Sequence, residues 1–385
     1  MALGRIVHIV AAPEFAHLIL LPDLRLLGAR HDHVVVCSPG PDADAVEAAG
    51  FQVERVNISR KIAFLRDVLA VRHLYLVLRR LQADAVHTYT PKAGLLGQIA
   101  AALVGTRCRI HSCRGLLYES KMRWWLRVIC TVTDRITFAL ADLCLFVSSA
   151  DRDFAVRERL CASRKARWTG NGVDLSRFRP LPDADRLRRD LRAELGIPDA
   201  ARVFLTVGRF VIAKGYEELL SAAGRVVEEN PDVYFVLVAP VLAGETGVVN
   251  LSRWHSGVLG GRILLVGRRD DIERFYCAAD VLVHPSHREG VPRVLMEAGA
   301  MGLPLIAADI PGNRQVVRGA HVGRLFKVRD SAALESAIRD ALRSWSATLE
   351  RGVEASGLIR QSHDSACVVD RVAGEYERLL SRGRE

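Results

Sequence analysis

The first segment with residues suited to chemistry follows an apolar, β-branched run at 203–207. There the chain reads Gly208-Arg209-Phe-Val-Ile-Ala-Lys214-Gly215, so two cations come shortly after the run. In open α/β sheets ligands bind beyond the carboxyl ends of the strands, where the next helix presents free N–H groups. Arg209 and Lys214 therefore predict a cradle for a diphosphate. The alternative is an ordinary surface loop with two solvated cations.

The second such segment carries two carboxylates, Glu289 and Glu297, after the run at 280–284. Pro292 is predicted as the first residue of a helix, which puts Glu289 just before the helix and Glu297 more than a turn inside it. We expect Glu289 to accept hydrogen bonds from sugar hydroxyls and Glu297 to hold a ribose diol. The N–H groups of 291–295 face phosphate oxygens in this arrangement. The alternative is a capping carboxylate followed by an ordinary helix glutamate.

The elements that must position these loops belong to the α/β class. Short apolar runs alternate with amphipathic stretches along the whole chain, which is typical of βαβ units and parallel sheets. In the first half we expect strands near 5–11, 33–38, 85–87, 109–111 and 143–147, and a helix at 92–103. In the second half we expect strands at 203–207, 233–238, 263–266, 280–284 and 304–308, and a helix ending at Glu229. The sequence predicts two doubly wound parallel sheets.

Two Rossmann-like domains are expected from the length and from a turn-rich segment in the middle. The 385 residues, half of them apolar, exceed what one core normally serves. The stretch 171–182 is dense in turn formers and makes a hinge. We divide the chain into domains at 1–175 and 176–362 and a C-terminal helix at 363–385 that packs back on the first domain.

The net charge of +10 arises entirely in the first half. Residues 1–180 hold 26 Lys and Arg against 16 Asp and Glu, and residues 181–385 hold 28 of each sign. A basic half favours anionic partners. No nucleic-acid-binding motif accompanies the cations, so we expect no nucleic acid partner. No Gly-x-Gly-x-x-Gly follows a predicted strand, which argues against a dinucleotide-dependent oxidoreductase.

The expected compartment is the cytoplasm. The eight cysteines form no Cys-x-x-Cys pair and several lie in apolar runs, which is typical of buried thiols in a reducing environment. The opening MALGRIVHIVAAPEF reads as a first strand and not as a secretory leader. No window of about 18 residues is apolar without charge, so we expect no membrane-spanning helix.

Four stretches carry a resemblance to a known family. They are HTYTPKAGLLGQIAA at 87–101, TGNGVDLSRFRP at 169–180, VGRFVIAKG at 207–215 and ADVLVHPSHREGVPRVLMEAGAMGLPLIAADIPGNRQVV at 279–317. With them, nearly the whole chain resembles the family 4 retaining glycosyltransferases of the GT-B fold. The resemblance implies two Rossmann-like domains facing each other across a cleft, the first binding the acceptor and the second the nucleotide-sugar.

The resemblance also implies roles for single residues. Arg209 and Lys214 would bind the donor diphosphate, Glu289 the transferred sugar and Glu297 the nucleotide ribose. The further donor-binding residues that we expect are Gly208, Gly290, Val291, Pro292, Arg293, Val294, Leu295, Asn171 and Val266. Arg114 joins the catalytic set, because it stands where many relatives place a histidine near the donor. The alternative for Arg114 is an ion-pair partner.

No metal and no other cofactor is expected, because the resemblance implies that cations of the chain neutralise the leaving nucleotide. Three Asp-x-Asp pairs, at 42–44, 151–153 and 183–185, lie in polar loops or at helix starts. We interpret them as surface or capping residues. One departure from the family concerns the loop after the first strand: many relatives carry a glycine pair there, and this chain has Ala11-Ala-Pro-Glu-Phe.

Two segments, 59–81 and 118–141, combine arginines and lysines with tryptophans or long apolar faces. Such a mixture suits a membrane interface. The alternative is a pair of helices whose apolar faces pack on the sheet while their cations are solvated. The residues concerned are Arg60, Lys61, Arg66, Arg72, Arg79, Arg80, Lys121, Arg123, Arg127 and Arg135, with Trp124 and Trp125.

The acceptor is the part of the function that the sequence defines least. REGVPR in the donor motif and HTYTPKAG in the first half are most similar to relatives that extend lipid-linked oligosaccharides in bacterial surface-glycan pathways. This likeness implies retaining transfer from a UDP-sugar to a polyprenyl-diphosphate-linked sugar, at the inner face of the cell membrane. Two alternatives stay open: a soluble acceptor such as an aminocyclitol, and a nucleotide-sugar epimerase of the same fold.

Overall fold

The computed structural model describes residues 3–59, 63–116, 118, 122–241, 245, 247–250 and 261–382. Arg60, Lys61 and Lys121, which belong to the basic segments, lie outside the described residues. Contacts divide the chain into two compact units, Met1–Asn171 with Ser365–Glu385 (unit 1) and Gly172–Asp364 (unit 2). The sequence-based boundaries after residues 175 and 362 lie close to these two divisions.

Unit 1 is built on a seven-stranded parallel sheet in the order β3-β2-β1-β4-β5-β6-β7. Its strands are β1 (Leu3–Ile9), β2 (His31–Cys37), β3 (Gln52–Arg55), β4 (Ala85–Tyr89), β5 (Cys108–Cys113), β6 (Leu143–Phe146) and β7 (Ala166–Trp168). Its helices are α1 (Pro13–Phe15), η1 (Ala16–Leu20), α2 (Leu21–Leu27), η2 (Gly28–Arg30), α3 (Pro41–Ala48), α4 (Phe64–Leu81), α5 (Pro91–Val104), α6 (Trp124–Leu140), α7 (Ser149–Arg157) and α15 (Ser365–Arg382).

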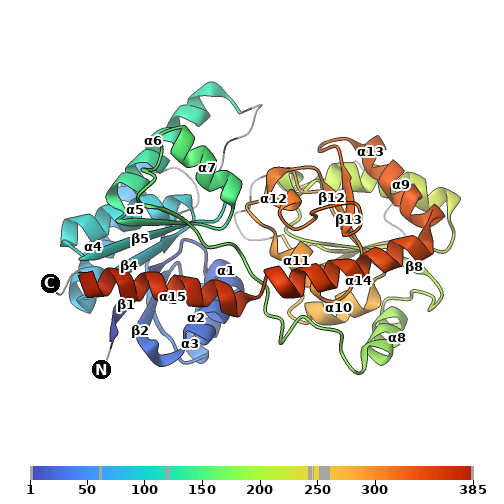
Figure 1. Ribbon diagram of the computed structural model, residues 1–385, viewed down its shortest axis with the longest axis horizontal. Coiled ribbons are helices and arrows are strands. Elements are labelled where there is room, and N and C mark those ends of the chain that lie inside the picture. The colour runs from blue at the N-terminus through green and yellow to red at the C-terminus, as the bar shows by residue number, and fades with distance from the viewer. Residues whose placement is uncertain are drawn as a thin grey trace. The chain divides into compact units, whose positions relative to one another are not determined.

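Helices cover both faces of this sheet (Figure 1). On one face α4 and α5 pack on the strands through a core that includes Leu74 and Leu78. On the other face α2, α3 and α15 close a second core, to which α15 contributes Val369 and Tyr376. The C-terminal helix therefore packs on unit 1. Strands buried on both faces read as continuous apolar runs, which is why the central ones could be predicted.

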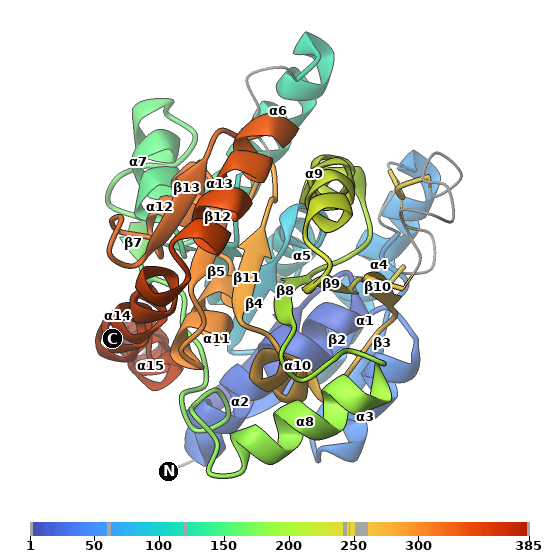
Figure 2. The same ribbon diagram turned by 90° about the vertical axis from the view of Figure 1, so that its right-hand side faces the viewer.

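Unit 2 repeats the plan with a six-stranded parallel sheet in the order β10-β9-β8-β11-β12-β13. Its strands are β8 (Arg202–Val207), β9 (Val233–Val238), β10 (Ile263–Val266), β11 (Val281–His284), β12 (Leu305–Ala308) and β13 (Gly323–Phe326). Its helices are α8 (Ala184–Glu194), η3 (Ile212–Lys214), α9 (Tyr216–Glu229), α10 (Ile272–Ala278), α11 (Arg293–Ala300), α12 (Pro311–Arg314), α13 (Ser331–Arg343) and α14 (Trp345–Ser362). Figure 2 shows α9 and α13 on one side of this sheet and α8, α10 and α11 on the other.

The predicted fold class, two doubly wound parallel sheets, is confirmed. Three strands escaped prediction, and all three are edge strands: β3, β7 and β13. Their sequences, QVER, ARW and GRLF, each carry charge and are short. Edge strands commonly carry charges, which interrupt the apolar pattern by which a strand is recognised. Among the described residues, no helix is long and apolar enough to cross a membrane.

Candidate active site

Both loops singled out from the sequence emerge at one point of the second sheet. β8 and β11 are neighbours, and the strand order reverses between them, because the chain builds β9 and β10 on one side and β12 and β13 on the other. At such a switch point the loops beyond the carboxyl ends diverge and leave room for a ligand. Arg209 and Lys214 follow β8, and Glu289 follows β11.

Close packing fixes the two loops against each other. The His287 N–H donates to the Ala213 carbonyl oxygen at 3.0 Å. Gly215 has a φ of +74°, and a Cβ there would lie 2.1 Å from the Pro285 carbonyl oxygen, so no other residue fits without moving the loops. The His287 Nε2 lies 3.0 Å from Glu218 Oε1 on α9. Sequence reasoning did not assign these positioning contacts, since each joins residues that are far apart in the chain.

Lys214 and Glu289 meet directly. The Lys214 Nζ donates to Glu289 Oε1 at 2.5 Å, and the Nε2 of His284, the last residue of β11, lies 3.2 Å from the same oxygen. The Glu289 side chain is 15% exposed and that of Lys214 22%. Burial acts to raise the pKa of Glu289, but Lys214 and His284 outweigh it and hold this pKa well below its usual range. Glu289 is therefore an ionised, acceptor-only group.

Glu297 lies one turn inside α11 in a different setting. Its Oε2 accepts a hydrogen bond of 2.7 Å from the Tyr276 hydroxyl on α10. Burial raises the pKa of Glu297 above its usual value, although Tyr276, Arg293 and Arg177 act to lower it. The two carboxylates thus differ in electrostatic environment. This difference fits two different tasks.

The helix that carries Glu297 begins one residue later than predicted. Pro292 was expected as its first residue, but it is the N-cap with an extended ψ of 122°, and α11 begins at Arg293. A cap residue lies in the β region and stands half outside the helix, so the prediction was wrong by one position. Gly290, Val291 and Pro292 are buried.

The short helix α12, which follows β12, packs against the residues just before this helix start. A Cβ at Gly312 would lie 2.3 Å from the Gly290 carbonyl oxygen and 2.5 Å from that of Glu289. Arg293 and Val294 are partly exposed, and Leu295 is fully buried. The backbone of Leu295, and not its side chain, is thus the part that could face a ligand.

Arg209 has a carboxylate partner of its own. Its Nη1 donates to both Glu245 oxygens, at 2.8 and 2.9 Å. Gly208, the first residue after β8, is close to the Lys214 side chain, whose Cδ lies 3.9 Å from the position of a Cβ at Gly208. Val266 ends β10, two strands away from β8, so it lies apart from this group in the sheet.

Arg114 and Asn171 belong to unit 1 and contact each other. The Arg114 Nη1 donates to Asn171 Oδ1 at 3.3 Å, and its Nη2 donates to Asp23 Oδ2 at 3.3 Å. The guanidinium carbon lies 5.7 Å from the ring centroids of both Phe15 and Tyr89. Arg114 is thus held in place at the carboxyl end of β5, by an ion pair and two aromatic rings.

The Asp-x-Asp pairs stand at the starts of three helices, and none of them is on the loops after β8 and β11. Asp42 and Asp44 are in the first turn of α3, Asp151 is in the first turn of α7, and Asp183 is the N-cap residue of α8. Asp42 lies 2.7 Å from His17 Nδ1, and Asp44 accepts from Arg55 at 2.6 Å. Within the described ranges, no group of three or more His, Cys, Asp or Glu side chains could hold a metal ion.

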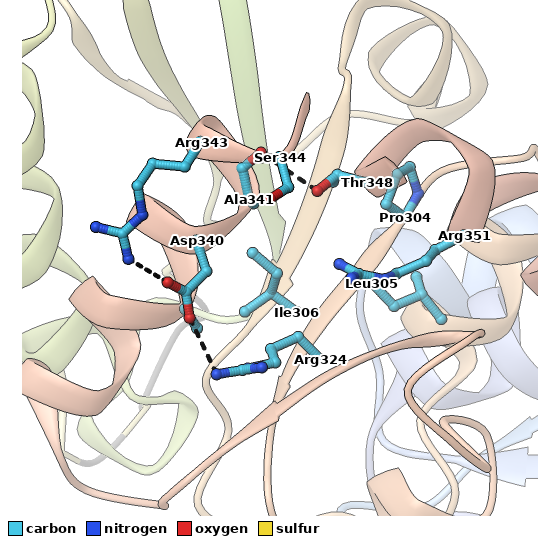
Figure 3. Close-up of a pocket in the computed structure, with 11 residues that line it drawn as sticks. Pro304, Leu305, Ile306, Arg324, Asp340, Ala341, Arg343, Ser344, Thr348 and Arg351 are labelled. Atoms are coloured by element: carbon cyan, nitrogen blue, oxygen red, sulfur yellow. Dashed lines mark hydrogen bonds and ion pairs between the residues drawn. The ribbon is translucent and has the colours of Figure 1, made fainter. Parts of the chain in front are cut away.

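A separate pocket of about 220 Å³ lies where β12 and β13 begin, beside α13 and α14 (Figure 3). None of the predicted site residues lines it. Two of its arginines are paired, since Asp340 accepts from Arg324 at 3.0 Å and from Arg343. This pocket lies at the amino ends of the strands, whereas Lys214 and Glu289 lie beyond the carboxyl ends.

Each half of the chain matches a glycosyltransferase family. Residues 24–177 match the family described as "Glycosyltransferase Family 4", and residues 188–355 match "Glycosyl transferases group 1". The chain is similar to the UDP-Gal:alpha-D-GlcNAc-diphosphoundecaprenol alpha-1,3-galactosyltransferase of Escherichia coli, with 29% identity over 335 residues that cover 85% of this chain and 84% of that protein.

Two further proteins are similar to this chain, one over about half of it and one over nearly all of it. The D-inositol 3-phosphate glycosyltransferase of Streptomyces coelicolor is 31% identical over 219 residues, which cover 52% of this chain and 48% of that protein. The crystal structure of Anabaena HepE in complex with UDP and glucose matches with a TM-score of 0.81 and 21% identity, over 97% of this chain and 99% of that one. This last likeness shows the fold.

Proposed function

Since the chain is a glycosyltransferase of the GT-B fold, with a family 4 pattern in its first half and a group 1 pattern in its second, we propose that its donor is a UDP-sugar. In this proposal the sugar is transferred to a hydroxyl of a polyprenyl-diphosphate-linked acceptor. The anomeric configuration is retained, and no metal takes part. The observation that carries the proposal is the Lys214–Glu289 pair at the switch point of the second sheet. The similarity to an enzyme named for a UDP-sugar donor and an undecaprenol-linked acceptor supports it.

The donor is held by unit 2 in this proposal. Lys214 and Arg209 lie on the loop after β8 and would contact the diphosphate, while the N–H groups at the start of α11 face its oxygens. Glu297 would accept hydrogen bonds from the ribose hydroxyls. As the bond to the sugar breaks, negative charge grows on the leaving phosphate. Two fixed cations neutralise it there, which is the work that a divalent metal does in other enzymes.

Glu289 orients the sugar and does not attack it. Its carboxylate is already engaged by Lys214 and His284, which stabilise the charged form and weaken it as a nucleophile. The free lone pairs accept hydrogen bonds from sugar hydroxyls. The leaving phosphate then directs the acceptor hydroxyl to the same face of the sugar and takes its proton. An oxocarbenium-like centre forms between them, and the configuration is retained.

Unit 1 offers a surface suited to a lipid-linked acceptor. Phe64 and Leu65 at the start of α4, and Trp124 at the start of α6, are 78–80% and 77% exposed. The apolar side chains that continue this exposure are Val68, Leu69 and Leu76 on α4 and Trp125, Val128, Ile129, Val132 and Ile136 on α6. Arg66, Arg72, Arg79, Arg80, Arg123, Arg127 and Arg135 are exposed on the same helices.

Apolar side chains flanked by arginines bind the surface of an anionic bilayer. Both α4 and α6 follow a parallel strand, so they begin at the carboxyl edge of the sheet, where Arg114 also lies. A polyprenyl tail held in the bilayer would present its diphosphate and sugar near this edge. The proposal puts the protein in the cytoplasm at the inner face of the membrane, which fits its eight free cysteines.

A soluble acceptor is the second candidate, favoured by the similarity over part of the chain to a D-inositol 3-phosphate glycosyltransferase. An epimerase is the third, and it would isomerise the nucleotide-sugar with no acceptor present. Thermal unfolding with a panel of UDP- and GDP-sugars in EDTA tests the donor. We expect UDP-sugars to raise the Tm without metal. Protection only by GDP-sugars, or only with Mg²⁺ or Mn²⁺, would contradict the proposal.

A further inference from the structure

Each of the three cations predicted for the reaction has a carboxylate partner within the chain. Arg114 pairs with Asp23, Lys214 pairs with Glu289, and Arg209 pairs with Glu245. The Glu289 carboxylate has a task in the proposed reaction, since it faces the sugar. Glu245 has no task in that reaction, although both of its oxygens accept hydrogen bonds from Arg209, the cation that is expected to bind the diphosphate.

Residues 247–249, which follow Glu245 closely in the chain, pair with the loop that carries Arg209. Val248 and Val211 form an antiparallel bridge. The Ile212 N–H donates to the Gly247 carbonyl oxygen at 2.8 Å, and the Val249 N–H donates to that of Phe210 at 3.3 Å. Glu245 is therefore brought to Arg209 by backbone pairing, and its position does not depend on the ion pair alone.

The ion pair itself is asymmetric. The Glu245 side chain is only 9% exposed, whereas that of Arg209 is 45% exposed. Both carboxylate oxygens accept from one guanidinium nitrogen, Nη1. A carboxylate and a phosphate offer the same kind of oxygen acceptors to a guanidinium. Glu245 thus stands in the place of an anionic ligand while no donor is bound.

We propose that Glu245 is a positioning residue that acts through Arg209: it serves as an internal counter-anion that competes with the donor diphosphate and thereby sets the affinity for the nucleotide. The inference rests on the proposed role of Arg209. With the donor absent, Glu245 holds the guanidinium beside the loop after β8. An arriving diphosphate must take over at least one N–H group and tolerate the nearby negative charge, so part of its binding free energy is spent on this exchange.

The test is a calorimetric titration of UDP into the full-length protein and into Glu245→Gln. The glutamine keeps the size of the side chain and removes its charge. We expect the Kd for UDP to fall by about two- to fivefold, because a partly exposed ion pair has a modest strength. Glu245→Asp, which keeps the charge, should stay near the wild type. The same change should appear in the KM for the UDP-sugar, with kcat altered less than KM.

The matched control is Glu335→Gln. Glu335 on α13 pairs with Arg225 on α9 and with Arg339 on its own helix, away from the loops after β8 and β11, so its neutralisation should leave the Kd for UDP unchanged. If Glu245→Gln proves unstable, Glu245→Ser in the same titration removes the charge with a smaller side chain. An unchanged or weaker affinity for UDP in the folded variants would overturn the inference.

Arg209→Ala separates this inference from the function on which it rests. If Arg209→Ala weakens UDP binding while Glu245→Gln fails to strengthen it, the inference is wrong and the proposed function stands. If Arg209→Ala binds UDP like the wild type, the diphosphate role of Arg209 is wrong. In the Arg209→Ala background we expect Glu245→Gln to have a smaller effect on the Kd for UDP, since the competition for the guanidinium is gone and only the repulsion between Glu245 and the diphosphate remains.

Discussion

The two units use the same sheet architecture, but the polar side chains near their switch points differ in kind. In unit 2 the region between β8 and β11 holds fixed charges, above all Lys214 and Glu289, on loops that follow the strands. In unit 1 the region between β1 and β4 holds neutral titratable groups buried between the strands and α15. The same fold thus carries charged side chains on the loops at the switch point of unit 2, and a buried, uncharged polar layer beside the Arg114–Asp23 ion pair in unit 1.

The layer in unit 1 is a connected chain of hydrogen bonds. His8 bonds to His33 at 2.9 Å and to the Tyr89 hydroxyl at 3.0 Å. His87 bonds to the Tyr376 hydroxyl of α15 at 2.6 Å. Burial lowers the pKa of His8 and His87 well below the usual value, and it lowers the pKa of His33 to about 4. Nearby histidines add to the effect, and at His87 the Arg114 guanidinium adds more than they do.

The two regions should respond differently to the loss of a charge and to protonation. The charges on the loops after β8 and β11 of unit 2 are paired and partly exposed, so their loss should weaken ligand binding more than it lowers the stability of the fold. Neutral histidines inside unit 1 must stay uncharged for α15 to pack, so their protonation should affect folding first.

The largest effect is expected for Glu289→Gln. The amide keeps the shape but removes the ionised acceptor that orients the sugar, so sugar transfer should fall by about a thousandfold. Affinity for free UDP should persist, because Glu297 and the start of α11 are unchanged. Initial rates and a thermal shift with UDP measure the two halves. Full activity would mean that the sugar is held elsewhere.

The next effect is expected for the two cations of the same edge. Arg209→Ala or Lys214→Ala should each lower kcat by about a hundredfold, because each removes a charge that stabilises the leaving phosphate. Lys214→Arg should recover only part of the rate, since a planar guanidinium does not replace a compact ammonium held at 2.5 Å from Glu289. Near-normal rates in both alanine variants would make them ordinary surface cations.

Acid should act on unit 1. A histidine whose folded pKa lies below its unfolded value binds more protons when unfolded, so the contribution of that group falls as the pH drops from about 6.5 towards 4. For His33 alone the loss at pH 5 is about 2 kcal/mol. We expect the Tm to fall between pH 7 and pH 5, and to fall less in His33→Asn. The same loss in that variant would show that the acid sensitivity arises outside the layer.

The smallest effect concerns the packing of the loops in unit 2. Gly215→Ala places a methyl group against the Pro285 carbonyl, at a φ of +74°. Gly196→Ala is a matched control, since its φ is +68° and a Cβ there meets nothing within 4 Å. Both substitutions cost about 1 kcal/mol for the backbone conformation. Gly215→Ala should lower the free energy of unfolding by more than this, because of the contact with Pro285, and it should also weaken UDP binding. Equal losses of unfolding free energy for the two variants in denaturant would contradict the packing argument.

The sequence predicted the parts that are continuous in the chain. The strands before Gly208 and Pro285 are apolar runs, and Lys214 and Glu289 stand directly after them, so the motif and its place in the fold could be predicted together. Their contact at 2.5 Å then follows from the pairing of β8 with β11.

What could not be predicted depends on contacts between distant residues. Glu245 meets Arg209 across 36 positions and belongs to no motif, and Asp23 meets Arg114 across 91 positions. The layer takes one histidine each from β1, β2 and β4, and nothing in these three short sequences indicates that their rings meet. The charged edge strands were missed for the converse reason, since their apolar pattern is broken.

The most direct test of the central claim is the transfer reaction itself. The full-length protein is incubated in EDTA with a panel of UDP-sugars and a short-chain polyprenyl-diphosphate-linked N-acetylglucosamine, and the product is analysed by mass spectrometry and NMR. We expect one UDP-sugar to add a single sugar to the lipid-linked acceptor with the anomeric configuration of the donor. An inverted anomeric centre, a strict need for Mg²⁺ or Mn²⁺, or isomerisation of the UDP-sugar without transfer would contradict it.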